Sequence, residues 1–169
     1  AVKTNDPAIF PLSPGSPAYG VNLDNDSFYH WPDVDLPGTW NLVGAIGSGS
    51  YYAGDFAGND FGQLYVINND SKMLLSVDTT TGVATPIGSC TPNPSQTWTG
   101  MAWDFSTDTM YASATDGSTA TLFTVNLATG ATTAVGTITG APFTIDIAID
   151  NAGQIYSVDI AAGQLMAID

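Results

Sequence analysis

A tyrosine recurs along this chain at a nearly constant interval. Tyr19, Tyr65, Tyr111 and Tyr156 are separated by 46, 46 and 45 residues. The residues around the last three are similar, and an aromatic residue lies thirteen positions before each of those three. Self-similarity at a fixed period of this length indicates a repeat architecture, in which each period is one small unit that packs on its neighbours. The spacing therefore predicts a row of similar units.

A pair of glycines marks a second position in the units. The members of each pair are six residues apart: Gly38 and Gly44, Gly82 and Gly88, Gly130 and Gly136. We expect the first glycine to take a positive φ in a tight turn, which other residues adopt only at a cost. An alternating strand precedes this turn, and a short strand lies between the glycines. A unit of four short strands in about 45 residues matches the period of a β-propeller blade.

These markers predict an all-β fold of three to four β-propeller blades, each with four antiparallel strands. The predicted blades span residues 18–47, 50–88, 96–136 and 141–169. Residues 1–17 are rich in proline and are predicted to form an extended lead-in. A β-sandwich or β-solenoid built from the same hairpins is the alternative fold.

The first and last predicted blades are incomplete, and an open row of blades leaves two apolar faces in water. We expect a partial propeller that is a piece of a longer protein. Alternatively, two copies pair as half-rings, or residues 8–12 supply the missing fourth strand of the last blade. The same residues are a candidate for the first strand of the first blade, although Asp6 stands where an aromatic residue is expected.

The chain is strongly acidic, with a formal net charge of −14 from 16 acidic and two basic residues. Such a surface repels the phosphates of nucleic acids and of anionic membranes, so we expect no nucleic-acid partner. No apolar stretch approaches the roughly 18 residues that a membrane span requires, so we expect no membrane insertion. The near absence of lysine and arginine leaves few sites for trypsin, which favours an extracellular setting.

The second unit contains the run Leu64-Tyr-Val-Ile-Asn68, followed by Leu74-Leu-Ser-Val-Asp-Thr-Thr-Thr-Gly-Val-Ala-Thr-Pro-Ile-Gly88. This pattern resembles the repeats of bacterial secreted propeller proteins of the PQQ-like, YVTN and NHL classes. The resemblance covers nearly the whole chain from Tyr19 onward. It implies a propeller fold and export, to the extracellular space or the cell surface. It implies no activity, because these repeats serve many functions.

Five residues are candidates for binding. Asp24 and Asp26 offer hard oxygens of the kind that Ca²⁺ prefers, or they stabilise a hairpin turn, where Asp is common. Trp40 and Tyr51 lie near predicted loops and could stack on sugar rings, or pack between blades. His30 is the only imidazole, and it is a candidate ligand or general base, or a strand residue packed on a neighbouring blade. Calcium is the one cofactor that the sequence suggests.

We predict a non-catalytic binding or scaffolding propeller module of a secreted bacterial protein, with a protein or glycan partner. Catalysis is not expected from this chain, since Glu and Arg are absent and neither Lys3 nor Lys72 lies in a recognisable motif. Two alternatives remain open. One is a self-assembling surface-layer protein, and the other is part of a secreted hydrolase or lyase whose catalytic groups lie elsewhere.

Overall fold

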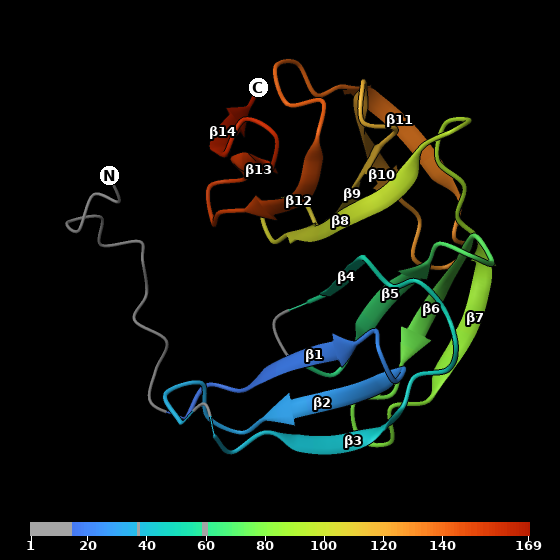
Figure 1. Ribbon diagram of the computed structural model, residues 1–169, viewed down its shortest axis with the longest axis vertical. Helices are drawn as coiled ribbons and strands as arrows, with labels where there is room; N and C mark the ends of the chain where they lie inside the picture. The colour runs from blue at the N-terminus through green and yellow to red at the C-terminus, as the bar shows by residue number, and fades with distance from the viewer. Residues whose placement is uncertain (1–14, 37, 59–60) are drawn as a thin grey trace.

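The computed structural model describes residues 15–36, 38–58 and 61–169 (Figure 1). Within these ranges the protein forms four antiparallel sheets and no helix. The predicted all-β, blade-type fold is therefore confirmed. Residues 1–14, which include most of the predicted lead-in and the candidate strand 8–12, lie outside the described residues.

Each strand pairs with the next strand of its sheet along the chain, as in a meander. The first sheet contains β1 (Ala18–Asn22), β2 (Ser27–Trp31) and β3 (Asn41–Ala45). The second contains β4 (Ala53–Phe56), β5 (Leu64–Asn68), β6 (Met73–Val77) and β7 (Ala84–Ser89). The third contains β8 (Thr97–Asp104), β9 (Thr109–Thr115), β10 (Ala120–Val125) and β11 (Thr132–Thr137). The fourth contains β12 (Thr144–Ile149), β13 (Ile155–Asp159) and β14 (Gln164–Ile168).

The four sheets follow one another around an arc, with the first and the fourth at its two ends (Figure 1). Strand β8 contacts both β4 and β12, so these three strands form the inner layer of the arc. The repeat tyrosines lie on β1, β5, β9 and β13, the strands that follow the inner position. The first sheet therefore has no described strand equivalent to β4, and the fourth has none equivalent to β7 or β11.

Three hydrophobic clusters lie between consecutive sheets and hold the arc together. Each cluster combines residues from one sheet with residues from the next: Phe28 with Leu75, Ile67 with Trp98, and Leu122 with Ile147. Alternate strand residues point to opposite faces, so a sheet in the middle of the arc buries both of its faces. The core is thus divided among the sheet junctions.

The fourth sheet, at one end of the arc, exposes an apolar residue that is buried at the equivalent position of the other three sheets. In each sheet, the residue two positions after the repeat tyrosine lies opposite an apolar residue on the neighbouring strand. These apolar residues are Phe28, Leu74, Leu122 and Leu165, which therefore occupy equivalent positions in the four sheets. The exposed fraction of the side chain is 1% for Phe28, 0% for Leu74 and 5% for Leu122, but 70% for Leu165 in the fourth sheet. Leu165 occupies a position that is buried at each of the three junctions, and in the described structure no further sheet covers it.

The predicted glycine pairs also have a role between sheets. Gly82 and Gly130 take positive φ values of 78° and 77° in the turns before β7 and β11, as expected. In the first two pairs the second glycine lies against the turn of the next sheet: a Cβ on Gly44 would collide with the carbonyl oxygen of Thr81. Gly88 lies in the same way against the turn that contains Gly130. Glycine is therefore required at this position by the close approach of two backbones.

Candidate functional site

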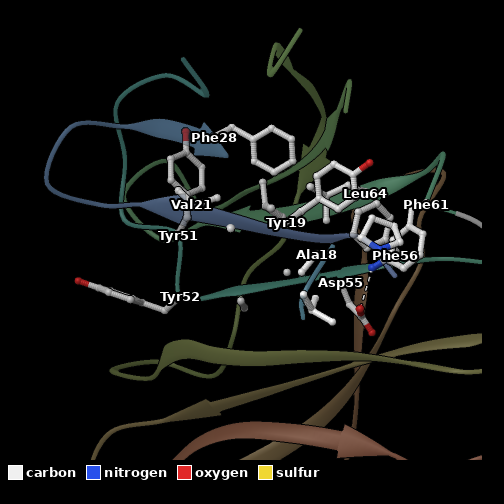
Figure 2. Close-up of a pocket in the computed structure, with 16 residues that line it drawn as sticks. Ala18, Tyr19, Val21, Phe28, Tyr51, Tyr52, Asp55, Phe56, Phe61 and Leu64 are labelled. Atoms are coloured by element: carbon white, nitrogen blue, oxygen red, sulfur yellow. Dashed lines mark hydrogen bonds between the residues drawn. The ribbon is translucent and has the colours of Figure 1, made fainter. Parts of the chain in front are cut away.

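A groove with a volume of about 540 Å³ lies between β1 and β4 (Figure 2). Consecutive residues of both strands line it, 17–21 on one side and 51–56 on the other. Because successive side chains of a strand point to opposite faces, a wall of consecutive residues exposes backbone as well as side chains. The groove lies beside the inner edge of β1, which pairs only with β2 among the described strands.

Aromatic side chains gather at one end of the groove, around Tyr19 (Figure 2). The Tyr19 ring centroid lies 5.2 Å from that of Phe56 and 5.8 Å from that of Phe61. Phe56 and Phe61 meet edge to face at 5.0 Å. Aromatic groups of this kind favour an apolar or planar partner, and Phe61 is 45% exposed, so it is accessible to one.

Two of the predicted binding residues belong to this region. Tyr51 lines the groove; its hydroxyl accepts a hydrogen bond from Asn68 Nδ2 at 3.3 Å and donates one to the carbonyl oxygen of Ser48. Burial raises the pKa of the Tyr51 hydroxyl, so it remains protonated at neutral pH. His30 does not line the groove, but it pairs across strands with Tyr19, and its ring stacks on the Tyr19 ring at 4.6 Å.

The other predicted residues lie elsewhere. Trp40 packs edge to face on Tyr29 at 4.4 Å and stacks near Trp31, away from the groove. Asp24 and Asp26 lie in the turn between β1 and β2, where the backbone of Asp26 has a positive φ of 53°. Within the described residues, no group of three or more His, Cys, Asp or Glu side chains is placed to hold a metal ion. A calcium ion at Asp24 and Asp26 stays a prediction.

Two carboxylates on the inner strands have unusual titration behaviour. The half-buried Asp55 on β4 accepts a hydrogen bond from the backbone N–H of Trp103 on β8 at 2.8 Å. Burial raises the pKa of Asp55, and the charge of Asp146 on β12 adds to this effect. Burial also raises the pKa of Asp146. These two acids place negative charge on both sides of β8, at the inner surface of the arc.

This arrangement predicts opposite pH profiles for two variants. A carboxyl with a raised pKa binds more protons in the folded protein, so stability falls as pH rises above its unfolded pKa of about 3.9. Asp55→Asn should therefore gain stability relative to the parent between pH 4 and pH 7. Asp78 has a lowered pKa because the N–H groups of Thr80 and Thr81 donate to it, so its carboxylate adds stability that is lost as pH falls below its unfolded pKa of about 3.9. Asp78→Asn should therefore lose stability relative to the parent as pH rises from about 2 to about 5. Urea unfolding across the two intervals checks this, and relative changes of equal sign for the two variants would contradict it.

The single cysteine is structural in this fold. Cys90 is fully buried, and burial raises the pKa of its thiol to about 12. Because the thiolate is the reactive form, this thiol is inert at neutral pH. Its carbonyl oxygen accepts a hydrogen bond from Trp98 Nε1 at 2.9 Å, which ties the linker before β8 to the core.

A family model described as "Domain of unknown function (DUF4394)" matches residues 45–148, which is more than half of the chain. No curated protein matches the sequence. The described part of the chain contains no helix long and apolar enough to cross a membrane.

Several solved structures are similar in fold. Regucalcin from Agrobacterium tumefaciens, described as a calcium-binding protein, is 16% identical with a TM-score of 0.60, over 90% of this chain and 50% of that one. A protein of unknown function from Bacteroides thetaiotaomicron is 17% identical with a TM-score of 0.63, over 89% of this chain and 44% of that one. Virginiamycin B lyase from Staphylococcus aureus is 10% identical with a TM-score of 0.59, over 91% of this chain and 52% of that one. The chain spans about half the length of these β-propeller-like proteins, and the likeness shows the fold alone.

Proposed function

The chain belongs to the DUF4394 family, and from that premise we propose that it is a non-catalytic binding module that takes an extended polypeptide segment into the groove between β1 and β4. One observation supports this most directly. Strands β4, β8 and β12 occupy the inner position of their sheets, whereas the groove occupies that position in the first sheet. The partner would thus take the place of a strand.

The backbone of β1 supports binding by strand addition. An unpaired strand edge presents a row of N–H and C=O groups that pair readily with another extended chain. In the second sheet, β5 uses the equivalent edge to pair with β4, in the antiparallel register Ala53 with Ile67 to Phe56 with Leu64. A segment of similar length added to β1 would pair in the same way with the edge that no described strand occupies.

The side chains around the groove limit the chemistry of the partner. The cluster of Tyr19, Phe56 and Phe61 favours a segment with hydrophobic residues at alternate positions. The net charge of −14 disfavours an acidic segment. We therefore propose a hydrophobic, neutral or basic strand as the partner, in preference to a glycan.

Residues 8–12 of the chain itself could compete for the groove. The connections between the inner strand and the next strand span 57–63, 105–108 and 150–154 in the other sheets. An inner strand that ended at Leu12 would leave 13–17 as a connection of similar length to β1. A segment in cis has a high effective concentration, so an external partner would have to displace it.

We propose an exported, extracellular setting for this module, in a bacterial protein. The support is the sequence itself, which has a net charge of −14 and only two lysine or arginine residues. The surface-layer and hydrolase or lyase alternatives would use the same fold, since propellers host many functions. The groove favours the binding role because its described lining contains one carboxylate, Asp55, and no other charged side chain.

A peptide titration tests the proposal. The probe is a peptide with the sequence of residues 97–103, which forms most of the inner strand of the third sheet and has no charged side chain. We expect saturable binding to the full chain by calorimetry, with slower amide exchange in residues 18–22. Phe61→Asp should weaken binding at least about tenfold, because an anchor side chain is lost from the groove.

Phe105→Asp is the matched control. Phe105 is 48% exposed and lies in the connection after β8, as Phe61 lies in the connection after β4, but it does not line the groove. Its variant should bind the peptide within about twofold of the parent, since surface changes away from a site have small effects. Absence of saturable binding, or equal weakening by both substitutions, would show that the groove is not the site. If residues 8–12 compete, Phe10→Asp should tighten binding of the peptide.

A further inference from the structure

The outer edge of the fourth sheet lacks a partner that the other sheets have. Strands β3, β7 and β11 complete the outer side of the first three sheets, whereas β14 pairs only with β13 among the described strands. A cavity of about 240 Å³ lies at this edge, lined by residues 137–139 at the end of β11 and by residues 166–169 at the end of β14. The end of β14 therefore borders a hollow beside the end of β11.

The glycine contacts show what would fill this space. Gly44 lies against the turn of the second sheet, and Gly88 lies against the turn of the third. Gly136 is the equivalent residue of β11, and a Cβ built on it meets nothing within 4 Å. Gly136 therefore has room for the close backbone contact that Gly44 and Gly88 make, and no described residue makes that contact.

The residue that follows β14 is of the type that begins the turn before the outer strand in the second and third sheets. Asp78 follows β6, and its Oδ1 accepts hydrogen bonds from the N–H groups of Thr80 and Thr81. Asn126 follows β10 and accepts from the N–H groups of the equivalent two positions. Asp169 follows β14 at the same place, so it is able to initiate the same type of turn.

We propose that the outer edge of β14 is a docking site for a β-strand of the chain's own repeat type, preceded by a turn whose glycine has a positive φ and lies against Gly136. The strand would pair antiparallel with β14, as β7 pairs with β6. This site is separate from the groove beside β1, which lies at the other end of the arc (Figure 1).

A strand of this kind fits the edge better than an arbitrary hydrophobic segment. In the second and third sheets a glycine at positive φ makes the contact, with the Cβ position of Gly130 only 2.6 Å from the carbonyl oxygen of Gly88. A side chain at that point would separate the turn from the preceding sheet. The site should therefore select for glycine at one defined position of its partner.

An extended chain tests the proposal. The sequence of residues 79–89, which forms the turn and β7 of the second sheet, is joined after Asp169 of the full chain. We expect the thermal midpoint to rise by about 3 °C or more, as a newly packed strand contributes at least about 1 kcal/mol. The amides of residues 164–168 should exchange at least about tenfold more slowly, because the edge of β14 becomes paired.

Two matched variants make the test specific. The first carries the same extension with valine in place of the glycine copied from Gly82, and it should lose the rise in thermal midpoint. The second introduces Gly136→Val into the extended chain, where it should also remove the rise, while in the unextended chain it should shift the midpoint by about 1 °C or less because Gly136 faces open space. No rise and no protection with the glycine extension, or an equal rise with the valine extension, would overturn the proposal.

Discussion

Trp98→Ala is expected to lower the free energy of unfolding by about 3–5 kcal/mol, the range for removal of a large buried aromatic side chain. Trp98 is 0% exposed and lies in the cluster between the second and third sheets. Its ring meets Phe123 edge to face at 5.0 Å, and its Nε1 donates to the carbonyl oxygen of Cys90 at 2.9 Å. The substitution removes the packing, the ring contact and the hydrogen bond together.

Urea unfolding at neutral pH measures this effect, and two further variants separate its causes. Trp98→Phe keeps most of the packing but leaves the buried Cys90 carbonyl without its donor, so a loss of about 1–3 kcal/mol is expected. Trp40→Ala removes an indole that is 49% exposed, and should cost about 1 kcal/mol or less. Equal losses for Trp98→Ala and Trp40→Ala would show that the second junction is not the main core.

Gly88→Ala is expected to lower the free energy of unfolding by about 2–3 kcal/mol, because an added methyl group in a tightly packed site forces the backbone to move. The new Cβ would collide with the carbonyl oxygen of Thr129, which belongs to the turn before β11. A backbone carbonyl cannot rotate away as the end of a flexible side chain can. The turn of the third sheet would have to separate from β7.

Gly136→Ala is the control that the repeat itself provides. Gly136 occupies the equivalent position in β11, but a Cβ there meets nothing within 4 Å. Its variant should unfold within about 0.5 kcal/mol of the parent in the same urea titration, as expected for an exposed site. If both variants lost the same stability, the effect at Gly88 would come from strand propensity and not from contact between sheets.

The repeat in the sequence was sufficient to predict the fold. The regular spacing of Tyr19, Tyr65, Tyr111 and Tyr156 reflects one strand position in four successive sheets, which the structure confirms. From the sequence, the glycine pairs predict only a tight turn and the limits of a short strand. Their contact across sheets, as between Gly88 and Gly130, joins residues that are far apart in the chain, so local pattern could not show it.

The candidate site was harder to predict. Tyr51 was named as a binding residue and lines the groove, but Trp40 packs on the opposite side of the first sheet, with Tyr29. Phe61 was missed because it lies in a connection outside the repeat pattern. Asp6 breaks the aromatic pattern of the first unit, and it lies outside the described residues. The groove lies beside the first sheet at the position where the structure describes no inner strand.

The contacts between glycines of neighbouring sheets also limit how such a chain can change in length during evolution. An insertion or deletion within a strand would shift Gly88 relative to Gly130 and replace a backbone contact by a clash. Gain or loss of a whole unit moves both members of a contact together and preserves every junction. Relatives of this protein should therefore differ in the number of units and in the length of connections such as 57–63, while their strands keep constant lengths.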